Sequence, residues 1–394
     1  MLIIVVLLAT LVSWLLAEAM LHSRRLRRIP IRITVSGTRG KSGTVRDIAS
    51  VMRLSGLRVL AKTTGTEAAY ILPDGTEEPV KRHGITSIDE QIRLVKKASS
   101  LGADALVTEI MSISPENHRA ETQMILKPDL TVFTNFNPDH IDAGGNTVAA
   151  TEEVMVCGIA GGATVIVHRN HLSPFIQETV NRAGATLVVA GTATSLQDEK
   201  ISGHARFPEN TDLVAAAASW LGIDAGITVA GLAAAHHDRG RAEIIEIERN
   251  GKRLWFATTF AANDPLSTEE ISRHLLKASG IEYSGVAGLL SFRADRAERT
   301  KQWLDYLNRT AATRYQHLFV TGSHTAIAAR RIKGITIISP RDPQTITETL
   351  FKILPDRTAV FGLANIAGAG LGLTEYWRAQ GIKSTNRWDT NSSS

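Results

Sequence analysis

The sequence predicts an α/β protein with one apolar helix at its N-terminus, followed by domains built on parallel sheets. Three observations indicate this: β-branched runs alternate with helical patterns, a glycine-rich turn joins a strand to a helix, and the first residues are uncharged. The 394 residues correspond to two or three domains. With 43% hydrophobic and 21% charged residues, the composition is that of a globular protein with a sizeable core.

The N-terminal segment has the features of a membrane anchor. Residues 2–17 carry no charge, and extension to Leu21 gives the roughly 20 residues that span a bilayer core. A signal peptide is an alternative, because Ala17-Glu18-Ala19 has the A-x-A form, and a buried core helix is another. However, the basic residues follow the apolar run: Arg24, Arg25, Arg27 and Arg28. We therefore expect residues 1–22 to form a single-pass anchor in the inner cell membrane, with the body of the protein in the cytoplasm.

The remaining chain is divided by its patterns into two α/β domains, expected over residues 23–225 and 226–394. In the first, strands are predicted at 31–35, 105–108, 130–134, 164–168 and 186–190, and helices at 43–54 and 211–221. In the second, strands are predicted at 242–247, 253–257, 287–292, 317–321, 335–338 and 358–361. The second domain lacks Gly-x-Gly-x-x-Gly, so no nicotinamide cofactor is indicated.

The segment Ser36-Gly37-Thr38-Arg39-Gly40-Lys41-Ser42 lies between a predicted strand and a predicted helix, as a phosphate-binding loop does. Glycines let backbone N–H groups face phosphates, and the helix N-terminus adds a positive dipole end. Val35 occupies the place of the pattern's first glycine, so this is a variant; a chance turn is the alternative. The expected nucleotide-binding residues are Gly37, Thr38, Gly40, Lys41, Ser42, Gly43 and Thr44, with Lys41 on the β/γ-phosphates and Ser42 on Mg²⁺.

Charge and cysteine content exclude other classes of function. The net charge is +5, and no interleaving of aromatic and basic residues supports nucleic-acid binding. Cys157 is the one cysteine, so neither an intramolecular disulfide nor a cysteine metal site can form.

The loop resembles the Gly-Thr-x-Gly-Lys-Ser loop of the Mur ligase superfamily, which includes the peptidoglycan amino-acid ligases and folylpolyglutamate synthetase. Later segments agree in order: 62–66, with its Thr-Gly-Thr; 107–109, ending in Glu109; 134–142, with Asp139-His140; and Asn210. The match is closer to the capsule poly-γ-glutamate synthetase family (CapB/PgsB), on Arg39, Glu67, the anchor and the segments 260–264, 292–296 and 362–368.

This resemblance implies a Mur-ligase-like central P-loop ATPase domain, a C-terminal Rossmann-like domain and an ATP-dependent amide ligase. Glutamate would be activated as an acyl phosphate, releasing ADP, and joined to another glutamate. The implied cofactors are ATP and Mg²⁺ or Mn²⁺. The implied catalytic residues are Lys41, Arg39 and His140; the metal ligands are Ser42, Glu109 and His140; Asn210 lies near adenine; and the substrate candidates are Lys62, Thr64, Asn263, Asp264 and Arg293.

Several of these residues also have structural interpretations. Glu109 could be a surface carboxylate, and His140 could cap a turn. Asn263-Asp264-Pro265 is also a plausible turn, and Arg293 could belong to a surface salt-bridge network. The pair His236-His237 with Asp238 is better interpreted as a solvated turn than as a metal site.

Two departures from the superfamily matter. Many Mur ligases carry a carbamylated lysine after the Asp-His pair, bridging two metals, but this chain has no lysine between Lys127 and Lys200, and Met155 lies near that place. A second metal would lack that bridge. The loop also begins soon after the anchor, which leaves no room for an N-terminal UDP-sugar domain and disfavours a UDP-linked substrate.

The resemblance implies glutamate, the growing acidic polymer and small membrane subunits of a synthesis and export complex as partners, and homo-oligomerisation is also open. One alternative is a related ligase that joins another amino acid to an acidic acceptor. Another, from a different class, is a membrane-associated P-loop NTPase that drives transport or signalling. Glu109 with Asp139-His140 favours ligation, because transport ATPases carry a Walker-B Asp instead.

Overall fold

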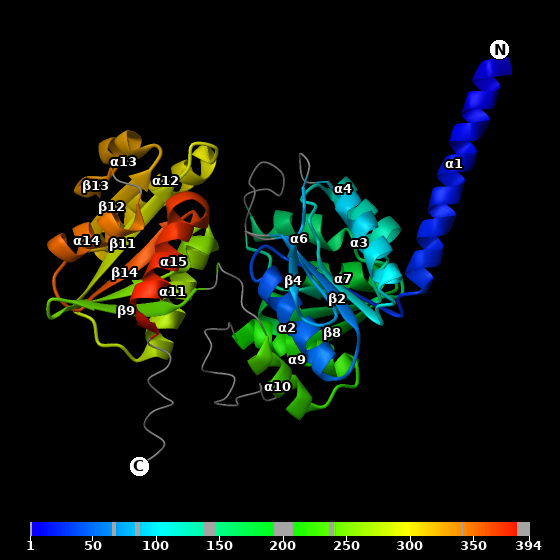
Figure 1. The fold of residues 1–394 in the computed structure, drawn as a ribbon, viewed down its shortest axis with the longest axis horizontal. Coiled ribbons are helices and arrows are strands. Elements are labelled where there is room, and N and C mark those ends of the chain that lie inside the picture. The colour runs from blue at the N-terminus through cyan, green and yellow to red at the C-terminus, as the bar shows by residue number, and fades with distance from the viewer. Residues whose placement is uncertain are drawn as a thin grey trace. The chain divides into compact units, whose positions relative to one another are not determined.

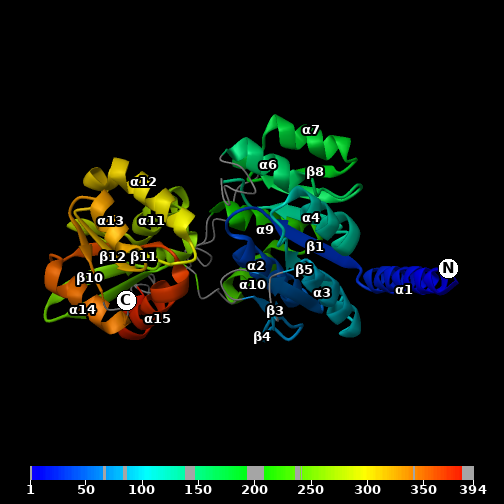
Figure 2. The same cartoon turned by 90° about the horizontal axis from the view of Figure 1, so that it is seen from above.

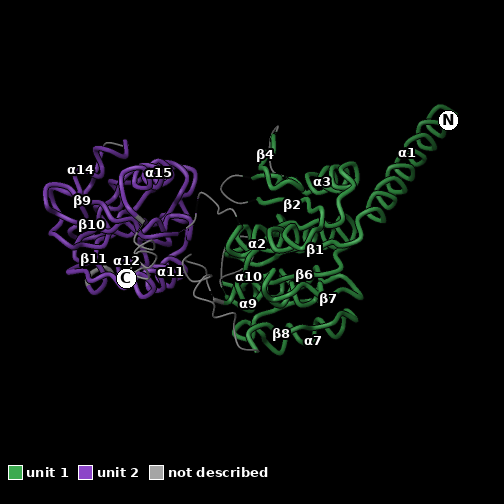
Figure 3. Tube along the Cα trace, turned by 60° about the horizontal axis from the view of Figure 1, so that its bottom comes forward, with its two compact units in different colours: residues 1–201, 206–237 green, residues 202–205, 238–394 purple. Residues whose placement is uncertain are grey.

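The computed structural model contains two compact units, which Figure 3 shows in different colours. Unit 1 comprises residues 1–201 and 206–237, and unit 2 comprises residues 202–205 and 238–394. The structure describes residues 2–64, 68–82, 87–137, 147–192, 208–235, 240, 242–339 and 342–383. Each unit has its own sheet and its own core, so each is described by itself.

Helix α1 (Leu2–Arg27) is the long apolar helix at the blue end of the chain in Figure 1. It is long and apolar enough to cross a membrane, with a mean hydropathy of 2.4 and 0% of its most apolar window buried. The helix continues past residue 22, where the anchor was expected to end. Leu26 is buried with Ile29 in the core of unit 1, and the His22 Nε2 lies 2.8 Å from the Ile125 carbonyl oxygen. The last turn of α1 therefore belongs to unit 1.

The sheet of unit 1 has the order β4-β3-β2-β5-β1-β6-β7-β8 over the described residues. The strands are β1 (Ile31–Ser36), β2 (Val59–Thr63), β3 (Ala69–Ile71), β4 (Glu77–Pro79), β5 (Ala105–Glu109), β6 (Leu130–Phe133), β7 (Thr164–His168) and β8 (Thr186–Ala190). From β2 to β8 in that order all neighbours are parallel, as predicted. The antiparallel β3–β4 edge was not predicted; its turn includes Gly75 at φ 89°.

Helices cover both faces of this sheet (Figures 1 and 2). One face packs against α2 (Lys41–Leu54), α9 (Pro208–Trp220) and α10 (Ala225–Ala234). The other helical segments are α3 (Asp89–Ser100), α4 (Pro115–Arg119), the π-helical η1 (Ala120–Leu126), α6 (Val148–Val156), η2 (Arg169–His171) and α7 (Pro174–Arg182). Neighbouring residues of β5 join different cores, Leu106 with α3 and Val107 with α2, as the alternation of a strand requires. The predicted two-faced packing is confirmed.

Helix α10 belongs to unit 1, although the sequence places residue 226 at the start of the second domain. The Ser50 hydroxyl of α2 donates a 2.8 Å hydrogen bond to the Gly231 carbonyl oxygen. A Cβ atom on Gly231 would lie 2.6 Å from the Val51 Cα, so the two helices meet backbone to backbone. The boundary between the units consequently follows α10 rather than preceding it.

The sheet of unit 2 has the order β13-β12-β11-β14-β10-β9-β15 over the described residues. The strands are β9 (Ile244–Arg249), β10 (Lys252–Ala257), β11 (Gly285–Phe292), β12 (His317–Gly322), β13 (Ile335–Ile337), β14 (Thr358–Ala364) and β15 (Ile382–Lys383). The run from β13 to β10 is parallel, whereas β9 and β15 are antiparallel to their neighbours. The β9–β10 hairpin turns at Asn250-Gly251, both at positive φ.

Helices also cover both faces of the second sheet, which confirms the predicted Rossmann-like α/β unit. One face packs against α11 (Pro265–Ser279), α12 (Ala297–Arg314) and α13 (Thr325–Arg331). The other packs against η3 (Thr259–Ala262), α14 (Pro343–Ile353), η4 (Ile366–Gly370) and α15 (Leu371–Gln380).

Replacement of Gly231 by Ala tests whether α10 is part of unit 1. The added methyl group would meet the backbone of α2, so we expect a loss of about 1–3 kcal/mol in the free energy of unfolding, measured by urea denaturation. Gly226→Ala in the same helix is the control, because its Cβ approaches only the Asp224 side chain, at 3.0 Å. Equal stability of the two variants would contradict this packing.

Candidate nucleotide and metal site

The register of three parallel strands brings the candidate residues of unit 1 to one edge of the sheet. Val35 on β1 lies opposite Glu109 on β5 and Val132 on β6. The Ile110 N–H donates to the Val35 carbonyl oxygen at 3.0 Å, and the Thr134 N–H donates to that of Ser36 at 2.9 Å. The loop after β1, the end of β5 and the segment after β6 therefore begin side by side.

The loop between β1 and α2 requires glycine at two positions. Gly37 has φ 129° and Gly40 has φ 81°, values that residues with a Cβ rarely adopt. A Cβ on Gly37 would lie 2.1 Å from the Thr134 Oγ1, and one on Gly40 would lie 2.6 Å from the Asn210 Nδ2. The backbone can pass closely between β6 and α9 only because these side chains are absent.

Asn135 holds the loop from the neighbouring segment, a role that the sequence did not reveal. Its Oδ1 accepts hydrogen bonds from the Thr38 hydroxyl at 2.6 Å and from the Arg39 N–H at 3.3 Å. Its Nδ2 donates to the Arg39 carbonyl oxygen at 2.9 Å, and its own carbonyl accepts from the Thr38 N–H at 3.2 Å. The available signal was its place in segment 134–142, directly after the β6 strand.

The first turn of α2 presents the other predicted phosphate-binding residues. The Lys41 Nζ donates a 2.6 Å hydrogen bond to the Gly37 carbonyl oxygen, which folds the ammonium over the loop. Ser42 is half-buried and Gly43 is exposed, at the N-terminus of the helix. The Thr44 side chain is buried, and its hydroxyl has no hydrogen-bond partner among the described residues. Lys41, Ser42 and the helix dipole together can receive an anionic phosphate group.

Glu109 ends β5 with a buried carboxylate that fits a divalent ion. Only 1% of the residue is exposed, so the interpretation as a surface carboxylate is wrong. Oε1 accepts from the Thr64 N–H at 3.0 Å and Oε2 from the Thr64 hydroxyl at 2.7 Å. No cationic side chain pairs with this carboxylate within the part of the chain that the structure describes. A buried charge with hydrogen bonds but no counter-ion suits Mg²⁺, which prefers oxygen ligands.

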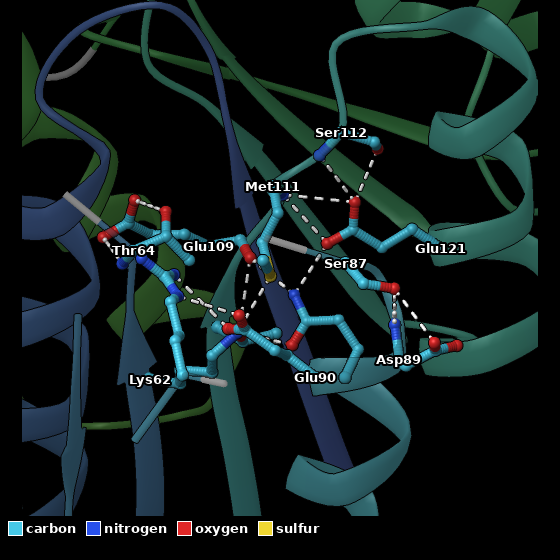
Figure 4. A network of polar contacts seen from close by, with 12 residues as sticks. Lys62, Thr64, Ser87, Asp89, Glu90, Glu109, Met111, Ser112 and Glu121 are labelled. Carbon is cyan, nitrogen blue, oxygen red and sulfur yellow. Dashed lines mark hydrogen bonds and ion pairs between the residues drawn. The ribbon is translucent and has the colours of Figure 1, made fainter. Parts of the chain in front are cut away.

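Behind Glu109 a buried polar network holds the end of β5 (Figure 4). The Gln91 Nε2 donates to the Glu109 carbonyl oxygen at 2.9 Å and to the Glu121 carboxylate at 2.6 Å. Glu121 also accepts from the Met111 and Ser112 N–H groups at 2.9 Å. Glu121 thereby fixes the chain that leaves β5, and neither it nor Gln91 carried a sequence signal.

Lys62, a predicted substrate ligand, has structural contacts of its own, and its contact with substrate stays a prediction. Its side chain is 0% exposed, and its Nζ lies 3.0 Å from the Glu90 carboxylate and 2.9 Å from the Met111 sulfur (Figure 4). Burial lowers the pKa of Lys62, and Glu90 offsets part of that effect. Burial pushes the pKa of Glu90 upward, but hydrogen bonds from Arg82 and Lys62 outweigh it and leave the pKa below its ordinary value. Lys62 therefore belongs to a buried ion pair.

Asn210 lies over Gly40 at the beginning of α9, and carboxylate–histidine contacts on both sides of it attach this helix to β7 and η2. The Glu209 carboxylate lies 2.8 Å from the His171 Nε2, and Asp212 lies 3.4 Å from the His168 Nε2. The hydrogen bond from His171, opposed by burial, lowers the pKa of Glu209 to about 2. Asn210 is thus held against the phosphate loop, and its predicted contact with adenine stays a prediction.

The substrate candidates of unit 2 have structural contacts of their own. Asp264 is buried and caps α11, accepting a 2.9 Å hydrogen bond from the Ser267 N–H. The Asn263 Oδ1 accepts from Arg299 at 2.9 Å, and Arg299 also donates to the Asn365 Oδ1 at 2.8 Å. Arg293 pairs with Asp295 at 2.6 Å. These contacts agree with the alternative interpretations, a turn at Asn263-Asp264-Pro265 and a surface salt bridge at Arg293. The predicted contacts with substrate stay untested.

Some predicted residues lie outside the described residues. They are Gly65, Thr66, Glu67, Asp139, His140, Asp142, His236, His237 and Asp238. The predicted catalytic and metal-binding roles of His140 therefore stay predictions.

The loop geometry predicts that one glycine substitution weakens nucleotide binding and that another leaves it nearly unchanged. Gly37→Ala introduces a Cβ at a positive φ and against Thr134, so we expect the affinity for Mg²⁺–ATP to fall about 10-fold or more, measured by calorimetric titration. Gly43→Ala places its Cβ where no protein atom lies within 4 Å, and its backbone N–H remains, so we expect near-normal affinity. Similar losses in both variants would contradict the assigned geometry.

Comparison with known proteins places the chain in a family. The Mur ligase middle domain model matches residues 35–232, and the poly-gamma-glutamate synthase CapB C-terminal domain model matches residues 244–380. The capsule biosynthesis protein CapB of Bacillus anthracis is 32% identical over 73% of this chain and 62% of that protein. The PGA synthase CapB of Bacillus subtilis is 27% identical over 90% of this chain and 92% of that protein.

The fold agrees with that of a solved ligase. The bifunctional folylpolyglutamate synthase/dihydrofolate synthase of Yersinia pestis, complexed with AMPPNP and Mn ion, superposes with a TM-score of 0.66 at 13% identity over 92% of each chain. The middle-domain match contains the phosphate loop, Glu109 and Asn210 in one unit, and the second match lies within unit 2. The chain therefore belongs to the Mur ligase family, in its poly-γ-glutamate synthase CapB branch.

Proposed function

We propose that this chain is an ATP-dependent amide ligase that polymerises glutamate into poly-γ-glutamate and releases ADP and phosphate. The observation that carries the proposal is a phosphate loop held by Asn135 beside the buried Glu109 carboxylate, which has no cation partner among the described residues. The names of the relatives, PGA synthase and folylpolyglutamate synthase, support glutamate as the substrate. The AMPPNP and Mn ion of the latter support ATP with a divalent cation.

The proposed reaction has two steps. A γ-carboxylate oxygen of glutamate attacks the γ-phosphorus of ATP, and ADP leaves, which gives an acyl phosphate. The amino nitrogen of a second glutamate then attacks the acyl carbon, and phosphate leaves with the bond electrons while the amine loses a proton. Because two anions meet in the first step, positioning and charge neutralisation are the main requirements.

The residues of unit 1 would meet these requirements in different ways. Lys41 and Arg39 would neutralise the phosphate oxygens, while the backbone of residues 37–43 donates N–H groups. Ser42, Glu109 and, by resemblance, His140 would hold Mg²⁺ or Mn²⁺, which would supply positive charge at the transferred phosphate. Thr44 and Asn210 would complete the nucleotide site. In unit 2, Asn263, Asp264 and Arg293 remain candidates for substrate contact.

The location and assembly of the chain form part of this proposal. Helix α1 would anchor the chain in the cell membrane, with Arg24, Arg25, Arg27 and Arg28 on the cytoplasmic side. Residues 23–237 would form the ATP-binding domain and residues 238–394 the C-terminal domain. The growing acidic polymer and small membrane subunits would be its partners, and self-association is also compatible with this arrangement.

Amino-acid-dependent ADP release tests the function. The full chain in detergent micelles, with Mg²⁺–ATP and a short glutamate oligomer, should release ADP only when L- or D-glutamate is supplied. Hydroxylamine should capture the activated carboxyl group as a hydroxamate. Equal ADP release without an amino acid would support the NTPase alternative, and AMP as the product would exclude this chemistry.

The variant Lys41→Ala tests the role of the loop ammonium in this reaction. Loss of the ammonium from the loop should lower the glutamate-dependent rate by roughly 10²–10³-fold, because charge stabilisation of the transferred phosphate is removed. Circular dichroism should show an unchanged fold, since Lys41 is a half-buried residue of the loop edge. A folded Lys41→Ala protein with the full rate would remove Lys41 from the mechanism.

A further inference from the structure

We propose that Thr64 is a positioning residue that orients the Glu109 carboxylate toward the divalent ion of the bound nucleotide. This inference rests on the proposed function, which makes Glu109 a metal ligand. It gives Thr64 a different role from the substrate contact that its sequence context suggested.

Thr64 binds both oxygens of one carboxylate. Its backbone N–H reaches the Glu109 Oε1 at 3.0 Å, and its hydroxyl reaches Oε2 at 2.7 Å. The terminal torsion of a glutamate side chain is soft, so a single donor would leave the carboxylate free to rotate. Two donors on separate oxygens fix its plane, and both bonds are strengthened by the charge of the acceptor.

The backbone of Glu109 is held independently of its side chain. On β5, Thr108 pairs with Lys62 of β2, so Thr64 follows β2 at the same edge where Glu109 ends β5. Gln91 fixes the Glu109 carbonyl, and Glu121 fixes the residues that follow (Figure 4). Because Gln91 and Glu121 hold the main chain, the hydrogen bonds from Thr64 determine the orientation of the Glu109 carboxylate.

The donor at this position is neutral, which preserves the charge of Glu109. A carboxylate offers about four lone-pair positions, of which Thr64 occupies two. The ammonium of Lys62, two residues earlier, is engaged by Glu90 at 3.0 Å. Among the described residues no cation therefore competes for the free lone pairs, and the full negative charge is available to a metal ion. An arginine or lysine at this position would orient the carboxylate but also neutralise it.

Two substitutions separate positioning from simple structural support. Thr64→Val keeps the shape and the backbone N–H but removes the hydroxyl, whereas Thr64→Ser keeps the donor. Thr63→Val is the matched control, because Thr63 is 1% exposed and its hydroxyl has no hydrogen-bond partner in the described part of the chain. All variants are made in the full chain.

The readout is Mn²⁺ binding, followed by electron paramagnetic resonance during titration of the AMPPNP-saturated protein. We expect Thr64→Val to weaken Mn²⁺ binding about 10-fold, since loss of a hydrogen-bond partner of a metal ligand typically has this effect. Thr64→Ser should restore affinity, and Thr63→Val should leave it unchanged. In a Glu109→Gln background, Thr64→Val should cause no further loss.

Unchanged Mn²⁺ affinity in a folded Thr64→Val protein would overturn the proposal, even if its melting temperature falls, because Thr64 would then be structural support only. If Thr64→Val does not fold, Thr64→Cys replaces it; the weak thiol donor should lower affinity several-fold, and wild-type affinity would overturn the proposal. If the wild-type protein forms the amide but Glu109→Gln leaves the Mn²⁺ affinity unchanged, the metal role of Glu109 is refuted while the proposed function stands. Absence of glutamate-dependent ADP release would refute the proposed function.

Discussion

The register between Val35 on β1 and Glu109 on β5 is the constraint on which the candidate site depends. It brings the end of β5 to the first residue of the phosphate loop, and the pairing of β1 with β6 places Asn135 against Thr38 and Arg39. A slip of one residue would turn the Glu109 side chain to the other face of the sheet. Because parallel strands end at a common edge, groups from distant parts of the chain meet without a long loop.

The buried carboxylates near the end of β5 differ in the groups that stabilise their charge. Lys62 and Arg82 neutralise Glu90 inside the unit, and Glu121 is satisfied by backbone and side-chain donors. Glu109 and Glu121 are both buried and have neutral donors, but Glu121 receives hydrogen bonds from three residues, Gln91, Met111 and Ser112, whereas Glu109 receives them from Thr64 alone among the described residues. A buried charge of this kind is costly without a counter-ion, so the site is organised for a cation that arrives with the nucleotide.

Local patterns predicted the fold well, and contacts between distant segments explain what they missed. The strand, glycine-rich turn and helix around Ser36–Ser42 are encoded within a few residues, so their order was predictable. The side-chain hydrogen bonds of Asn135 and the burial of Lys62 depend on partners far along the chain, in the phosphate loop and in α3. The apolar pattern of α10 does not reveal that Gly231 packs on Val51, so the boundary was placed too early. Asn250-Gly251 is typical of a hairpin turn, and this signal was not used, so the antiparallel pairing of β9 with β10 was not predicted.

The most direct measurement is a crystal structure of the full chain with Mg²⁺ and a non-hydrolysable ATP analogue. The expected result is a Mg²⁺ ion about 2.1 Å from a Glu109 carboxylate oxygen, with the phosphates in the loop of residues 37–43 and both Thr64 hydrogen bonds intact. A Mg²⁺ ion held only by phosphate oxygens and water, with Glu109 still bound to Thr64 alone, would contradict the assignment of Glu109 as a ligand of the divalent ion.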